Sequence, residues 1–172
     1  EVEVMVGLPT ADPRSLVFAH RSLFLKHAND YDLFIYTEDD ILITQEHIKS
    51  FLEVTSYLPD NKVAGLVRYE VGSDNSINML DIHASFHWWP ESVESIEPYT
   101  FAEFSNKHSG AYILTRSQLL VALNSGNYAL VPERSRYGVL ESGASDLFHY
   151  CNLHKVICIS HFTVSFITVP CN

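Results

Sequence analysis

Three adjacent acids, Glu38, Asp39 and Asp40, interrupt an apolar run in the stretch YDLFIYTEDDILIT (residues 31–44). Neighbouring carboxylates repel one another, and the repulsion costs more free energy when the groups are partly buried. Their hard oxygen atoms suit Mg²⁺ or Mn²⁺, which would neutralise the acids and keep coordination positions free for phosphate oxygens. The residues therefore indicate a metal-diphosphate site. The alternative is a solvated acidic turn that caps the helix after it.

The apolar segments on both sides predict where these acids lie in a fold. Residues 32–36 (DLFIY) are typical of a strand, and residues 2–9 (VEVMVGLP) predict a second buried strand. Asp12 and Pro13 begin a helix between them, so the first 36 residues predict a parallel βαβ unit. Ligands of open α/β sheets bind beyond the carboxyl ends of the strands. The acids would therefore lie at the binding edge of the sheet.

The rest of the chain predicts further alternation of helices and strands. Thr44 and Thr115 are each placed to cap a helix, and these helices end before Pro59 and at Gly126. Residues 70–105 lack sustained periodicity and predict long loops and short irregular strands over one face of the sheet. The remaining predicted elements are strands at 63–69, 110–115, 155–162 and 164–169 and a helix within 138–151. We expect one α/β domain over residues 1–172, with a mixed sheet flanked by helices.

Composition excludes several classes of function. The chain has 172 residues, of which 47% are hydrophobic, enough for the core of one domain. A net charge of -10 with only 11 Lys and Arg argues against a nucleic-acid partner. No apolar stretch approaches the roughly 20 residues that cross a bilayer. Cys151, Cys158 and Cys171 form no CxxC pair, so we interpret them as small buried hydrophobic residues rather than disulfide or metal-binding residues.

The stretch FIYTEDD (34–40) resembles the acidic motif of nucleotide-sugar-dependent glycosyltransferases of the GT-A fold, here in a Glu-Asp-Asp variant. The resemblance extends in order over nearly the whole chain, through the segments His20-Arg21, GLVRYE (65–70), NKHSGAYILTR (106–116), YGVLESGASDLF (137–148) and KVICISHF (155–162). The chain is also similar to capsid-modifying glycosyltransferases of large algal viruses. The resemblance implies a GT-A-like (Rossmann-like) mixed sheet. Only 37 residues precede Glu38, so it implies a compact or N-terminally truncated form.

The resemblance also implies roles for the acids. Asp40 would ligate Mn²⁺ or Mg²⁺, Asp39 would share that role or contact the donor, and Glu38 would orient the pair. Many relatives have a further histidine ligand late in the chain, and His161 is the nearest match here. The metal would act as a Lewis acid that stabilises the departing nucleoside diphosphate.

An inverting transferase also needs a carboxylate base for the acceptor hydroxyl. Glu141 and Asp146 are the candidates, and they diverge on a helix because they are five residues apart. We prefer Glu141, at the start of the helix, over Asp146. The alternative for each is an ordinary acid on a helix surface.

Several other polar residues are candidate donor ligands. Asn106 and His108 can bond to sugar hydroxyls, and Gly110 lets the backbone approach a sugar or phosphate closely. The alternative is a polar turn that leads into a strand. Arg68 would meet a phosphate or pair with Glu70.

Aromatic residues and one histidine complete the candidates. Trp88 and Trp89 would either stack on an acceptor sugar or fold back as a plug over the sheet. His20, on the apolar face of the first helix, is interpreted as a core histidine.

These interpretations predict a metal-dependent hexosyl- or deoxyhexosyltransferase. It would move a sugar from a UDP- or GDP-linked donor to a hydroxyl of a glycan or glycoprotein, with inversion. The alternative is a non-catalytic or degenerate carbohydrate- or nucleotide-binding domain of the same fold. The expected location is the Golgi lumen if the parent is a eukaryotic secretory-pathway enzyme and the cytoplasm otherwise.

Overall fold

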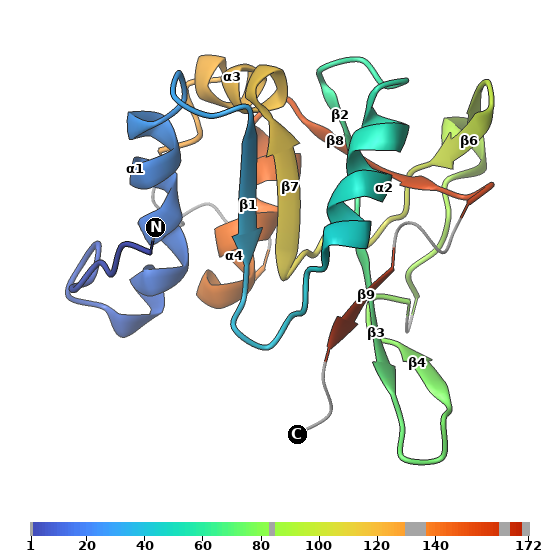
Figure 1. Cartoon of the computed structure of the whole chain (residues 1–172), viewed down its shortest axis with the longest axis horizontal. Helices are drawn as coiled ribbons and strands as arrows, with labels where there is room; N and C mark the ends of the chain where they lie inside the picture. Colours follow the sequence, from blue (N-terminus) through green and yellow to red (C-terminus); the bar gives the residue numbers. More distant parts are fainter. Residues whose placement is uncertain (1, 83–84, 130–136, 162–165, 170–172) are drawn as a thin grey trace.

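A computed structural model describes residues 2–82, 85–129, 137–161 and 166–169. Helices and strands follow one another along the chain, with the β1–β7 pair between α1 and α2 in the view of Figure 1. The helices are η1 (Pro13–Phe18), α1 (Ala19–Lys26), α2 (Gln45–Thr55), η2 (Pro90–Ser92), α3 (Arg116–Asn124), α4 (Val139–Ser145) and α5 (Leu147–Tyr150). The strands are β1 (Leu33–Thr37), β2 (Lys62–Ala64), β3 (Val67–Val71), β4 (Ile77–Met79), β5 (Glu94–Ile96), β6 (Tyr99–Ala102), β7 (Ala111–Thr115), β8 (His154–Cys158) and β9 (Phe166–Val169).

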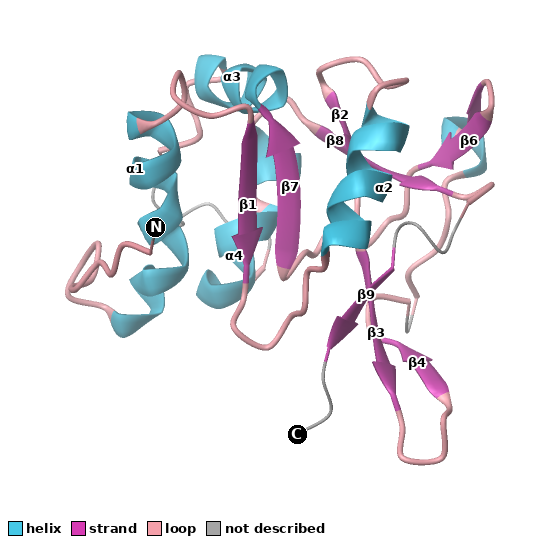
Figure 2. Cartoon of the chain, viewed as in Figure 1, coloured by secondary structure: helices cyan, strands magenta, loops and turns pink. Residues whose placement is uncertain are grey.

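The described strands form three sheets, shown in magenta in Figure 2. β1 pairs antiparallel with β7, with Phe34 opposite Leu114. A second sheet has the order β2-β8-β6-β5, and a third has the order β4-β3-β9. Parallel pairs (β2 with β8, β3 with β9) occur beside antiparallel ones, which confirms a mixed α/β protein.

The predicted helix starts are confirmed by their caps. Thr44 Oγ1 accepts a hydrogen bond from the backbone N–H of His47 at the start of α2. Thr115 does the same for Gln118 at the start of α3, and the Gln118 side chain accepts from the Thr115 N–H in return. Such reciprocal caps satisfy donors that the first helical turn leaves unpaired.

The core is one cluster of apolar side chains around β1, β7 and the helices. Ile113, Leu114 and Leu119 are fully enclosed. Phe24 of α1 packs against Phe34 of β1, with 5.3 Å between the ring centroids, and so anchors that helix to the sheet.

Two interpretations of single residues are confirmed by the packing. His20 packs in the aromatic cluster of α1 and β1, where its Nε2 is 2.7 Å from the Tyr112 hydroxyl. Cys151 and Cys158 are buried free thiols, whereas Cys171 lies outside the described residues. Within the described ranges, no helix is both long and apolar enough to cross a membrane.

The predicted strand over residues 2–9 is wrong. Residues 2–12 form no helix or strand, and the side chains of Val2, Val4 and Val6 are 89%, 79% and 97% exposed. Among the described strands β1 pairs only with β7, so the first 36 residues form no parallel βαβ unit. An apolar β-branched run becomes a strand only where another strand completes its hydrogen bonds, and sequence periodicity does not report that partner.

The predicted strand over residues 63–69 is divided in two. β2 ends at Ala64 and β3 begins at Val67 in a different sheet. Gly65 lies at the crossing point, where an added Cβ would come within 2.6 Å of Lys155 Cγ and 2.9 Å of Ile157 Cδ1. A glycine therefore lets the chain pass closely over β8 as it moves from one sheet to the next.

Candidate functional site

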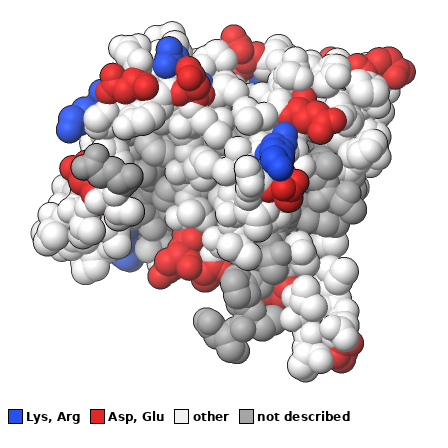
Figure 3. Space-filling view, in the orientation of Figure 1, with Lys and Arg blue, Asp and Glu red and all other residues white. Residues whose placement is uncertain are grey.

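The three acids occupy a turn directly after β1. The Ile41 N–H donates to the Glu38 carbonyl over 3.3 Å, and the Thr37 hydroxyl donates to the same carbonyl over 3.0 Å. Asp39 and Asp40 are exposed, whereas Glu38 is half-buried. Figure 3 shows acidic atoms at the surface where the loop between β1 and α2 passes. These hydrogen bonds fix the backbone of the turn. The carboxylates of Asp39 and Asp40 remain accessible to a ligand from solvent.

Glu38 and Gly110 join the end of β1 to the start of β7. The Glu38 N–H donates to the Gly110 carbonyl over 3.0 Å. A Cβ on Gly110 would lie 2.6 Å from Ile41 Cδ1, 2.8 Å from Glu38 Oε2 and 3.1 Å from Arg68 Nη1. The absence of a side chain at Gly110 therefore makes room for the Glu38 carboxylate and the Arg68 guanidinium on the same side of the chain.

Arg68 is held by Asp81 rather than by Glu70. Its Nε and Nη2 donate to Asp81 Oδ1 over 3.1 and 2.9 Å, and its backbone N–H donates to Asp81 Oδ2 over 2.8 Å. Asp81 is only 3% exposed. The proposed Arg68–Glu70 pairing is thus wrong, because the side chain turns toward the buried acid. Sequence reasoning missed Asp81, which lies in the aperiodic region without a motif to mark it.

His108 and Asn106 complete this network. Arg68 Nη2 is 2.9 Å from His108 Nδ1. Asn106 is 4% exposed, donates from Nδ2 to the Asp81 carbonyl over 3.1 Å and accepts from the His108 N–H over 3.1 Å. The Asn106 side chain therefore shapes the loop, whereas His108 is the better placed of the two for a ligand because 19% of its side chain is exposed.

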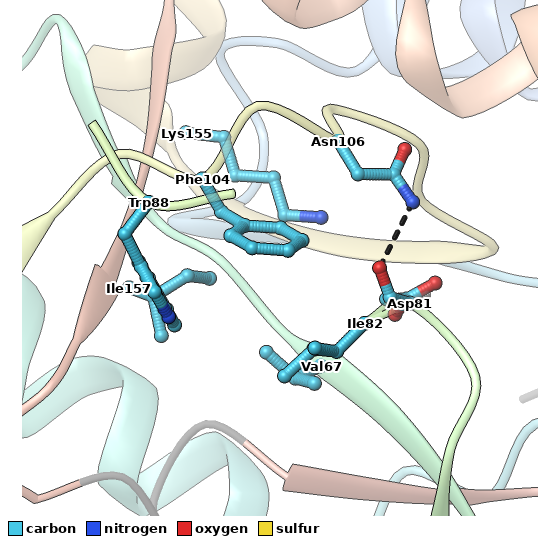
Figure 4. Close-up of a pocket in the computed structure, with 8 residues that line it drawn as sticks. All are labelled: Val67, Asp81, Ile82, Trp88, Phe104, Asn106, Lys155 and Ile157. Atoms are coloured by element: carbon cyan, nitrogen blue, oxygen red, sulfur yellow. Dashed lines mark hydrogen bonds between the residues drawn. The ribbon is translucent and has the colours of Figure 1, made fainter. Parts of the chain in front are cut away.

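Lys155 is a buried cation behind this loop. Its Nζ donates to the His108 carbonyl over 2.8 Å and to Ser109 Oγ over 2.9 Å. In Figure 4, the polar ends of Lys155, Asn106 and Asp81 lie on one side of a small cavity, and aromatic and aliphatic side chains line the other. The cavity measures about 10 Å³, roughly the room that one water molecule needs.

The charges in this network shift several pKa values. Burial raises the pKa of Glu38, the nearby Asp40 raises it further, and the Arg68 charge opposes the rise. Burial alone would raise the pKa of Asp81, but the neighbouring His108, the Lys155 charge and the hydrogen-bonded Arg68 hold it well below its usual range. Burial lowers the pKa of Lys155 to about 8 despite the attraction of Asp81. The site therefore keeps Asp81 ionised as the fixed anion of the network.

The two candidate bases point in different directions. Glu141 is exposed in the first turn of α4, and its carboxylate lies back over Gly138. Asp146 is 6% exposed, its Oδ2 lies 3.9 Å from Arg21 Nη2, and burial raises its pKa. Asp146 could act on a substrate only if this contact opened. Glu141 is therefore the more accessible candidate.

Helix α4 nevertheless lies against the loop that carries His108. The Ser109 N–H donates to Ser145 Oγ, at the end of that helix, over 3.2 Å. A residue before α4, Tyr137, places its ring 6.0 Å from the His108 ring. The helix that carries the candidate bases is thus joined to the loop that carries the candidate donor ligands.

The remaining predicted residues pack on aromatic side chains. The His161 ring packs on Tyr99 at 5.5 Å, beyond the end of β8. Trp88 folds back on Phe104 at 4.8 Å and lines the small cavity, whereas Trp89 is 40% exposed beside the His87 ring. Within the described part of the chain, no three His, Cys, Asp or Glu side chains are gathered into a ready metal site.

Comparison with protein-family models, curated proteins and solved structures finds no significant match to this chain. A mixed α/β fold is compatible with many activities, so it is the geometry and chemistry of the site that bear on function.

Proposed function

We propose that this protein is a metal-dependent glycosyltransferase with a compact GT-A-like arrangement around β1. One observation carries the proposal: Glu38, Arg68, Asp81, His108 and Gly110, from segments far apart in sequence, meet where β1 ends and β7 begins. The half-buried Glu38 carboxylate lies near a fixed guanidinium there, and the exposed Asp39 and Asp40 follow Glu38 directly in the same turn, a charge pattern that suits a metal-bound diphosphate. The ordered resemblance of the sequence to such enzymes supplies the choice of sugar nucleotides as donors.

The donor set of the turn fits a hard divalent cation. Asp39 and Asp40 are exposed and would bind Mn²⁺ or Mg²⁺ through their carboxylates, with Glu38 orienting the turn through its contact with Gly110. When bound, the metal supplies Lewis-acid stabilisation of the leaving diphosphate. His161 packs on Tyr99 instead and is left out of the proposed ligand set.

The chain's own residues then bind and orient the donor and the acceptor. Arg68, fixed by Asp81, offers its Nη1 donors to an anionic oxygen in the space over Gly110. Glu141 accepts the proton of an acceptor hydroxyl in the proposed inverting reaction. The exposed Trp89 offers an apolar ring face to an acceptor sugar on a glycan or glycoprotein.

A non-catalytic binding domain is the second candidate function, and the placement of Asp146 favours it. Asp146 is buried against Arg21, so only one of the two candidate bases is accessible. In that case nucleotide sugars would bind with the metal, but no sugar would be transferred.

A transfer assay separates the two functions. Release of nucleoside diphosphate from UDP- and GDP-sugars would be followed with Mn²⁺ or with EDTA, using the wild type, Glu141→Gln and Asp40→Asn. The enzyme proposal expects metal-dependent release that falls at least about 100-fold in Glu141→Gln, which is the usual contribution of a general base. The control, Glu46→Gln, changes an exposed glutamate in the first turn of α2. Binding without release supports the second function, and neither binding nor release contradicts both.

A further inference from the structure

The contact between Arg68 and His108 determines which nitrogen of the imidazole carries its proton. Arg68 Nη2 lies 2.9 Å from His108 Nδ1, and a guanidinium has only donors. His108 Nδ1 must therefore accept, and the proton of the neutral ring lies on Nε2. Asp81 Oδ1 is 3.9 Å from the same Nδ1, too far for the hydrogen bond that would favour the other tautomer.

Each of the two side chains thus has a donor that no described residue uses. Arg68 Nε and Nη2 are taken by Asp81 and His108, whereas Nη1 makes no hydrogen bond within the described residues and faces the space over Gly110. His108 Nε2 likewise has no hydrogen-bond partner among these residues. Both side chains are partly exposed, at 17% and 19%. On each side chain, one or more nitrogens are hydrogen-bonded within the network and another nitrogen remains available as a donor.

We propose that Arg68 Nη1 and His108 Nε2–H form an oxyanion-binding pair for a phosphate group, with Asp81 as the positioning residue that fixes both donors. This proposal rests on the proposed function only for the choice of phosphate as the ligand. The two donor atoms are identified by the Asp81–Arg68–His108 contacts alone. The proposal also excludes His108 as a metal ligand through Nε2. Coordination there would put the proton on Nδ1, against an Arg68 N–H that can only donate.

The wild-type protein provides the first test. Long-range ¹H–¹⁵N spectra of the nine histidines, with His108 assigned by His108→Gln, would report the tautomer directly. We expect the Nε2–H tautomer in the wild type and a mixture in Asp81→Asn, which frees the guanidinium to move. A predominant Nδ1–H form in the wild type would overturn the proposal.

Binding of pyrophosphate in EDTA provides the second test, without a metal or a nucleotide sugar. We expect pyrophosphate to shift the His108 resonances and to bind at least tenfold more weakly to Arg68→Lys and to His108→Gln. The matched controls are Arg116→Lys and His154→Gln, which alter partly exposed ion-paired residues away from this network. Equal binding to the wild type and both variants would refute the pair.

The two tests separate this proposal from the proposed function. If metal-dependent nucleotide-sugar binding fails but pyrophosphate still binds through Arg68 and His108, the phosphate pair stands and the transferase proposal falls. If nucleotide sugars bind with Mn²⁺ and Arg68→Lys or His108→Gln leaves that binding unchanged, the pair falls alone.

Discussion

Replacing Lys155 with Met should change how stability depends on pH. Lys155 is 5% exposed, and burial lowers its pKa from 10.5 to about 8. Between these two values the unfolded chain carries a proton that the folded chain does not, so the free energy of unfolding rises with pH. The full difference between the two pKa values corresponds to about 3 kcal/mol in the free energy of unfolding, since one pKa unit is worth about 1.4 kcal/mol.

The assay is urea denaturation at pH 7.5, 8.5, 9.5 and 10. We expect the free energy of unfolding of the wild type, relative to that of Lys155→Met, to rise by about 2 kcal/mol across this range. Methionine also leaves the His108 carbonyl and the Ser109 hydroxyl without the Lys155 donor, so the slope with pH, rather than the absolute stability, is the diagnostic quantity. Lys49→Met removes an exposed lysine and should leave the slope unchanged. Parallel curves for the wild type and Lys155→Met would refute the reasoning.

Three further substitutions test the packing that positions the site. Gly110→Ala should lower the free energy of unfolding by about 1–3 kcal/mol, because its Cβ would come within 3 Å of Ile41 and Glu38; an unchanged denaturation midpoint would contradict this contact. Trp88→Ala should lower the free energy of unfolding by about 2–3 kcal/mol through loss of its contact with Phe104, whereas Trp89→Ala should change it by no more than about 0.5 kcal/mol. Equal losses of stability in thermal unfolding would contradict the packing of Trp88 over the sheet. Gln118→Ala should cost about 2 kcal/mol, because the buried Gln118 caps α3 and donates to the Lys62 carbonyl over 2.8 Å. The control is Gln45→Ala, which changes an exposed residue of α2. Equal stability of the two variants would show that the hydrogen bonds of Gln118 contribute little to stability.

Local signals in the sequence predicted the helix starts and the position of the acids well. Thr44 and Thr115 each cap a helix through a residue three positions later, so both caps depend only on a few neighbouring residues. The acids likewise follow β1 directly, and the Gly110 segment leads directly into β7. Such features depend on neighbours in sequence, and for that reason they could be predicted.

Features that depend on distant partners could not be predicted in the same way. The run of valines before Pro9 has the composition of a buried strand, yet Val2, Val4 and Val6 are exposed because none of the described strands pairs with them. Arg68 was expected beside Glu70, but its partner is Asp81, which a turn of the chain brings back to it. The sequence analysis gave Glu38 only the role of orienting the other two acids, whereas its hydrogen bond with Gly110 and the nearby Arg68 charge make it the acid most closely tied to the network.

Calorimetric titration with UDP-, GDP- and CMP-sugars, with Mn²⁺ and with EDTA, tests the central claim most directly. The wild type would be compared with Asp40→Ala and with Asp60→Ala, a control that removes an exposed acid in another loop. The proposed metal-diphosphate site predicts that at least one donor binds only with Mn²⁺, and that Asp40→Ala abolishes this binding while Asp60→Ala leaves it intact. Binding that needs no metal, or that Asp40→Ala leaves unchanged, would contradict it.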